Sequence, residues 1–102
     1  MRKLEFYVPK DHAETVKEAV FAAGAGKIGD YDKCCWCAEG TGQFRPLEGS
    51  DPFIGSKDEV ERVPEMKVEM VCDDDAIDAV VEALKKAHPY ETPAYQHWKV
   101  DS

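Results

Sequence analysis

The sequence lacks any apolar run approaching the roughly 20 residues that span a bilayer, although 43% of its 102 residues are hydrophobic. Its first residues, Met1–Phe6, include a basic pair but no apolar segment of the kind found in secretion signals. Basic residues are also scarce, since 13 Lys and Arg face 21 Asp and Glu, a formal net charge of −8. We therefore expect a cytoplasmic protein with no membrane or nucleic-acid partner, because an acidic chain repels a phosphate backbone.

Glycine is absent from most of the chain, because all seven glycines fall between residues 24 and 55. The flanking regions are therefore free to form regular elements. Charged residues (33%) and aromatic residues (10%) occur at levels that argue against general disorder. The length predicts one domain spanning 1–102.

Residues 3–8 alternate between apolar and polar side chains, which predicts a strand that Pro9 ends. A helix is expected over about 11–24, with Asp11 as N-cap and Glu14 completing a capping box. The apolar stripe of that helix consists of Ala13, Val16, Val20 and Ala23. Glycines then end the helix.

The glycine-rich middle of the chain predicts a hairpin. Its first strand covers 34–38, the turn is the sequence Glu-Gly-Thr-Gly at 39–42, and a short strand returns over 43–46. A loop follows over 47–58.

The second half predicts a strand over about 62–72, a helix over 74–87 and a final strand over 94–100. Asp73 or Asp74 is the expected helix cap. The helix stripe comprises Ile77, Val80, Val81, Leu84 and Ala87.

This order of elements predicts an α+β fold, the ferredoxin-like split βαβ arrangement (βαββαβ with an extra hairpin). Right-handed crossovers place both helices on one face of an antiparallel sheet. The other face is then bare, and an exposed apolar face typically marks an interface. We expect self-association there through the aromatic side chains of Trp36, Phe44, Tyr95 and Trp98.

Three segments carry a resemblance to a known family: Gly24–Cys34, Gly40–Pro46 and His88–Tyr95. Pro52–Gly55 and Glu65 fall in the matching order. The sequence resembles the domain inserted in YqfO-type members of the Nif-three-like family, here in a stand-alone version. The resemblance implies a CutA/PII-like fold and favours a trimer over a dimer. It carries over no metal-dependent activity, because the two-metal site of that family lies in flanking domains that this sequence does not contain.

Three of the four residues 34–37 are cysteines, and clustered thiols are common metal ligands. A structural zinc site needs four ligands, usually as two separated pairs. On a strand Cys35 and Cys37 share one face while Cys34 points the other way. Buried thiols are one interpretation; the other is a divalent or soft metal ion held by Cys35 and Cys37 with His97, His88 or His12 as helpers.

The sequence His-Pro-Tyr-Glu at 88–91 is polar and fits neither helix nor strand periodicity. His88 and Glu91 are either an acid–base or ligand-binding pair or a hydrogen-bonded lock at the helix end. We expect their turn to pack against the loop at 24–34, which would bring Tyr31 and Cys34 beside them as one small-molecule or metal site.

Two kinds of function are consistent with these residues. One is a small oligomeric binding or regulatory module with no cofactor and no assigned catalytic residue. The alternatives are an enzyme that uses His88, Glu91 and a cysteine, or a soft-metal binding protein.

Overall fold

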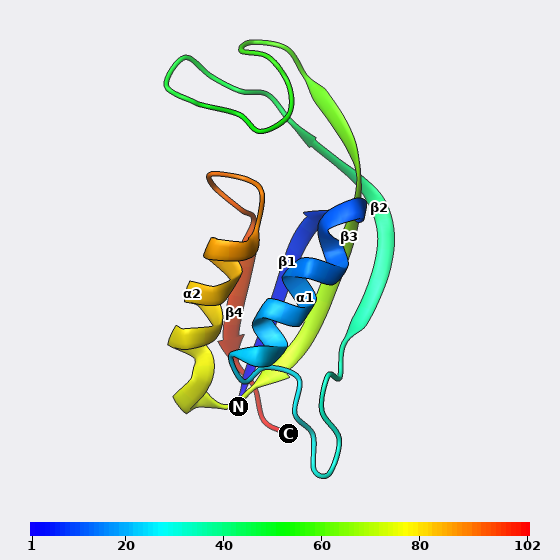
Figure 1. Ribbon diagram of the computed structural model, residues 1–102, viewed down its shortest axis with the longest axis vertical. Coiled ribbons are helices and arrows are strands. Elements are labelled where there is room, and N and C mark those ends of the chain that lie inside the picture. The colour runs from blue at the N-terminus through cyan, green and yellow to red at the C-terminus, as the bar shows by residue number, and fades with distance from the viewer.

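Four strands and two helices follow one another along residues 1–102, all of which the computed structural model describes (Figure 1). The strands pair antiparallel in the order β2-β3-β1-β4. This is the ferredoxin-like arrangement that the sequence predicted. The elements are β1 (Arg2–Pro9), α1 (Ala13–Ala22), β2 (Trp36–Phe44), β3 (Glu61–Cys72), α2 (Ile77–Ala87) and β4 (Tyr95–Lys99), with 3₁₀ turns η1 (Lys10–His12) and η2 (Asp74–Ala76) before the helices.

The core lies between the sheet and the two helices, which cover the same face (Figure 1). Strand β1 is central and points its apolar residues toward the helices, with Leu4, Phe6 and Val8 fully buried. The predicted apolar stripes of the two helices pack against these side chains of β1. Their buried members are Ala13, Val16 and Val20 of α1 and Ile77, Val80 and Leu84 of α2.

The helix starts differ from the prediction, because neither α1 nor α2 has a side-chain cap. Asp11 lies in η1 and contacts the ring of His12, while Glu14 pairs with Lys17. The 3₁₀ turns place Asp11 and Asp74 ahead of the first α-helical turns, which separates their carboxylates from the free N–H groups there. Asp74 pairs instead with Lys99, whose hydrogen bond is the main cause that lowers the pKa of Asp74 to about 2.

The predicted hairpin within 34–46 is wrong. Strand β2 runs through Gly40 and Gly42 without a turn and pairs with β3 along its whole length, from Trp36 opposite Glu69 to Phe44 opposite Glu61. The partner strand therefore outweighs the local turn preference of the glycines. A single loop, 45–60, joins β2 to β3.

The β2–β3 pair extends past the rest of the sheet. Pairing of β1 with β3 stops at Pro9 opposite Glu65, whereas β2 and β3 stay paired to Glu61. This extension carries loop 45–60 beyond the core, where the loop folds back toward turn 88–94 (Figure 1). The chain is accordingly elongated, with extents of 46 × 24 × 22 Å.

The bare face of the sheet holds only part of the expected aromatic area. Trp36 and Trp98 are 65% and 42% exposed and lie on the two edge strands. Tyr95 instead pairs with Phe6 and packs on the core side. Between the edges the face carries charged residues, including the pairs Lys3–Glu69 and Lys67–Glu5.

Neither helix has the length and apolar character needed to cross a bilayer.

The burial of Phe6 gives a test of the core. Replacing Phe6 with Ala should lower the free energy of unfolding by about 3–5 kcal/mol, because it removes a fully buried aromatic side chain from the central strand. Urea denaturation measures the change. Tyr31→Ala, at a side chain that is 75% exposed, is the control and should change stability by less than about 0.5 kcal/mol. Equal losses in both variants would contradict the core assigned here.

Candidate functional site

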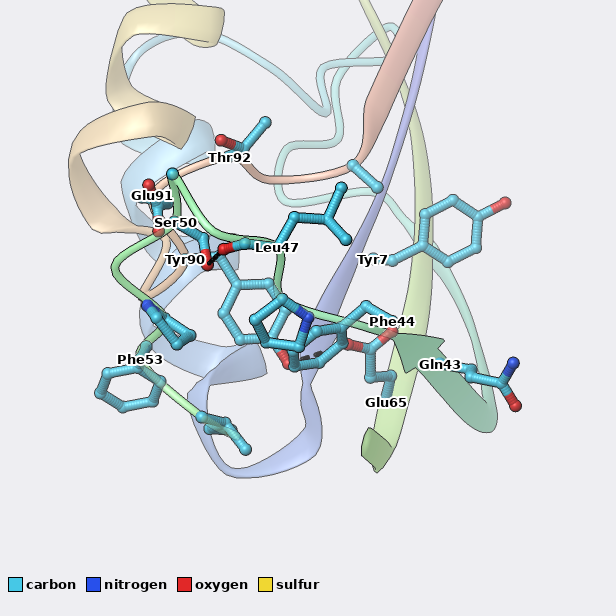
Figure 2. Close-up of a pocket in the computed structure, with 15 residues that line it drawn as sticks. Tyr7, Gln43, Phe44, Leu47, Ser50, Phe53, Glu65, Tyr90, Glu91 and Thr92 are labelled. Atoms are coloured by element: carbon cyan, nitrogen blue, oxygen red, sulfur yellow. Dashed lines mark hydrogen bonds between the residues drawn. The ribbon is translucent and has the colours of Figure 1, made fainter. Parts of the chain in front are cut away.

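A cavity of about 490 Å³ lies where loop 45–60 folds over turn 88–94. The ends of β1, β2 and β3 form its floor, so segments far apart in sequence meet there (Figure 2). The lining residues are Tyr7, Gln43, Phe44, Pro46, Leu47, Gly49, Ser50, Pro52, Phe53, Ile54, Glu65, Tyr90, Glu91, Thr92 and Ala94.

Tyr90 and Glu65, two of the lining residues, contact each other. The Tyr90 hydroxyl donates a hydrogen bond to Glu65 Oε2 at 3.1 Å. Burial, and next the nearby Glu65 carboxylate, raise the pKa of Tyr90, so the phenol stays protonated and remains a donor. Two further rings surround it, with the centroid of Phe44 at 5.6 Å and that of Phe53 at 6.5 Å (Figure 2).

Glu65 reaches this position because the neighbouring strand has no side chain at residue 42. A Cβ atom added to Gly42 would overlap Glu65 Oε1. The carboxylate therefore lies directly over the glycine backbone. Gly40, two residues earlier on β2, has no atom within 4 Å of its virtual Cβ, so the close approach is particular to Gly42.

Glu91 ties the loop to the turn. Its Oε2 accepts a hydrogen bond of 2.7 Å from the backbone N–H of Asp51, across 40 residues of sequence. Within the loop, the Ser50 hydroxyl donates to the Leu47 carbonyl at 2.6 Å. Outside the cavity, the His12 ring meets Phe53 edge-on at 5.4 Å. Loop 45–60 is thus held over the cavity by one polar contact and by aromatic packing.

His88 lies behind the cavity rather than in its lining. It is only 5% exposed, and its Nε2–H donates to the Tyr7 carbonyl at 2.7 Å. Its Nδ1 accepts the Tyr90 N–H at 3.1 Å. Burial is the main cause that lowers the pKa of His88, which favours the neutral ring that this arrangement needs. The geometry matches the hydrogen-bonded lock, and the lock positions Tyr90.

The prediction that Tyr31 and Cys34 lie beside His88 and Glu91 is wrong. The loop at 24–34 is tied to the other end of the sheet, where Gly26 N–H bonds the Val71 carbonyl opposite Lys3. His88 binds at Tyr7, near the far end of β1. Strands β1 and β3 are antiparallel, so the helices that leave them run in opposite directions and end at opposite ends of the molecule (Figure 1).

The expected metal ligands are not brought together either. Cys35 and Cys37 share a face, with their sulfur atoms 3.9 Å apart, but they belong to the β2 edge of the sheet. His97 belongs to the opposite edge, on β4, and accepts a hydrogen bond from Arg2. Burial is the main cause that raises the pKa of Cys35, which disfavours the thiolate that binds metals. No group of three or more His, Cys, Asp or Glu residues is arranged to hold a metal ion.

Sequence reasoning missed Phe44, Glu65 and Tyr90 as site residues. The signal lay in the segments that carried the family resemblance. Gly40–Pro46, Pro52–Gly55, Glu65 and His88–Tyr95 all contribute to the cavity lining. A hairpin within 34–46 would keep these segments apart, so the local sequence pattern does not predict their convergence.

Solved structures define the fold. CutA1 from Pyrococcus horikoshii aligns over 100% of this chain and 85% of its own, with a TM-score of 0.70 at 20% identity. CutA from Archaeoglobus fulgidus, described as a periplasmic divalent cation tolerance protein, has a TM-score of 0.68 at 16% identity. The chain therefore has the CutA-like fold. No family model matches the sequence.

More similar sequences define its relationship. The chain is 50% identical over 93 residues to a protein of Mycobacterium leprae and 45% identical over 101 residues to one of Bacillus subtilis, both named GTP cyclohydrolase 1 type 2 homolog. The solved Bacillus cereus protein related to NIF3 is 39% identical, with a TM-score of 0.84 over 99% of this chain and 26% of its own. The chain spans about a quarter of the length of these relatives. It is homologous to one segment of the YqfO-type, Nif-three-like proteins, as its motifs indicated.

The buried His88 predicts a pH-dependent stability. Its pKa in the folded protein lies below the unfolded value of about 6.5, so its contribution is fully present above that pH and is lost as the pH falls. Replacing His88 with Ala should cost about 1–2 kcal/mol at pH 7.5, because two backbone groups lose their partner. Chemical denaturation of wild type and variant at several pH values should show this difference shrinking toward pH 5.

Tyr31→Ala, at an exposed residue far from His88, is the control and should keep the pH profile of the wild type. A His88→Ala variant as stable as wild type at pH 7.5 would contradict the lock.

Proposed function

We propose that this domain is a small-molecule binding module whose ligand occupies the cavity under loop 45–60. The cavity itself is the observation that carries the proposal. Its volume of about 490 Å³ lies within the roughly 300–1,000 Å³ of small-molecule sites. Its lining combines apolar and aromatic side chains with a few polar groups, which is typical of such sites.

The polar groups of the cavity support binding rather than catalysis. The Glu65 carboxylate accepts the Tyr90 hydroxyl, and the Glu91 carboxylate accepts a backbone N–H. His88 uses both ring nitrogens in hydrogen bonds to the backbone. These groups hold the walls in place, and none of them forms the nucleophile–base pair that covalent catalysis requires.

A regulatory role is consistent with the way the cavity is closed. Loop 45–60 belongs to the β2–β3 extension and contacts the turn mainly through the Glu91–Asp51 hydrogen bond and the Phe53 ring. A ligand bound beneath this loop would add contacts to both segments. Binding would therefore fix the extension relative to the core, and the extension is the part of the molecule best placed to report it to a partner.

We expect ligand binding to depend on Phe44, because its ring forms the cavity wall beside Tyr90. Small aromatic compounds, added during two-dimensional ¹H–¹⁵N NMR, should shift the backbone amide signals of residues 47–51, 53 and 90–92. Phe44→Ala should weaken binding at least fivefold. Tyr31→Ala, an exposed aromatic residue at the other end of the molecule, is the control and should leave the affinity unchanged. Shifts confined to the 24–34 loop would contradict the proposed site.

We further propose that copies of the chain associate through the bare sheet face into a trimer. The resemblance of the sequence to a CutA/PII-like domain favours this state, and Trp36 and Trp98 provide exposed aromatic area at the sheet edges. Light scattering should give a mass near three times the 11.4 kDa of the chain. The double variant Trp36→Glu, Trp98→Glu should be a folded monomer, because charge at a desolvated interface is costly. A monomeric wild type at micromolar concentration would overturn this proposal.

A further inference from the structure

We propose that the ligand of the cavity is a small organic cation with an aromatic or apolar body, of which an arylalkyl ammonium ion is the simplest example. The inference rests on the proposed function and specifies its ligand class. It follows from the charge of the cavity lining, from its aromatic walls, and from an unpaired carboxylate oxygen of the lining residue Glu65.

All charged side chains that line the cavity are negative. Glu65 and Glu91 are its carboxylates, and no Lys, Arg or His is among the fifteen lining residues. Loop 45–60, which covers the site, contains two basic and four acidic residues. The nearest histidines are His88, held neutral behind the wall, and His12, which contacts the Asp11 carboxylate. A phosphate or carboxylate ligand would meet two carboxylates with no cation to balance its charge, so the lining selects against nucleotides and organic acids.

The aromatic walls suit a cation equally well. Tyr7, Phe44, Phe53 and Tyr90 line the cavity. Aromatic faces attract ammonium and guanidinium groups through the negative charge of the ring face, and the attraction is stronger where water is excluded. They also pack against the apolar body of the ligand. Figure 2 shows Phe44 and Glu65 beside Tyr90, with Glu91 and Ser50 on one side and Gln43 on the other.

Glu65 is the expected partner of the cationic group. Its Oε2 accepts the Tyr90 hydroxyl, whereas its Oε1 has no hydrogen-bond donor in the protein. Glu91 is engaged differently, because its Oε2 holds the Asp51 N–H and keeps the loop closed. We therefore assign the ion pair with the ligand to Glu65 and loop closure to Glu91.

Gly42 gives a way to move the Glu65 carboxylate without removing its charge. A methyl group at residue 42 would overlap Oε1, and the flexible end of Glu65 would have to swing away. Gly40→Ala on the same strand meets no atom within 4 Å and is the matched control.

Three probes of similar size test the proposal: 2-phenylethylammonium, 2-phenylethanol and 3-phenylpropionate. Calorimetry and ¹H–¹⁵N NMR on the full 102-residue chain at pH 7 measure their affinities and sites. We expect the ammonium ion to bind at least tenfold more tightly than the alcohol and the propionate to bind least. Glu65→Gln and Gly42→Ala should each reduce the preference for the ammonium ion over the alcohol at least fivefold. Gly40→Ala should retain it, and thermal midpoints verify that each variant is folded.

The outcomes separate the two proposals. If the alcohol or the propionate shifts the cavity amides and binds as tightly as the ammonium ion, the ligand class is wrong and the binding function stands. If the ammonium preference survives in both Glu65→Gln and Gly42→Ala, the assignment of Glu65 is wrong. If no probe shifts any cavity amide at millimolar concentration, the proposed function fails and the ligand class with it.

Discussion

The first four residues of strand β3, 61–64, precede the stretch of β3 that pairs with β1. Because β2 follows β3 over these four residues, the two strands form an extension beyond the main hydrophobic core cluster, although Val63 is buried there. The cavity depends on this difference in length. If β2 and β3 ended level with Pro9, loop 45–60 would have no support beyond the sheet and could not reach turn 88–94.

The second requirement is that turn 88–94 stays in place under the loop. A buried imidazole contributes to this, because His88 joins the Tyr7 carbonyl of β1 to the Tyr90 N–H. The Tyr7 N–H also donates to the Ala94 carbonyl at the end of the turn, at 3.2 Å. Tyr90 then reaches Glu65 on β3, and Glu91 reaches Asp51 in the loop. The residues that the sequence singled out as a site are thus split between two roles. His88 fixes the wall, and its neighbours in sequence form the lining.

The sequence predicted the elements of the fold well because each has a strong local signal. The alternation of Leu4, Phe6 and Val8 and the stripe of Ile77, Val80 and Leu84 mark which side of each element faces the core. The predictions failed where a distant partner decides the outcome. Residues 39–42 have the composition of a turn, yet pairing with β3 keeps them extended. Asp11 is a residue type that often caps a helix, yet a 3₁₀ turn places it ahead of the helix.

The sequence by itself determined the fold class, the faces of the helices and strands, and the acidic character that the cavity shares, because periodicity and charge are properties of the chain. The motifs that resemble the Nif-three-like family also contain most of the residues that line the cavity; Tyr7, Leu47, Gly49 and Ser50 lie outside them. Only the tertiary structure decided which of those segments meet. The antiparallel course of the two helices sends the loop at 24–34 and turn 88–94 to opposite ends of the sheet, while the β2–β3 extension brings loop 45–60 to the turn. Such long-range pairings depend on the whole sheet, since no short segment specifies the partner against which it folds.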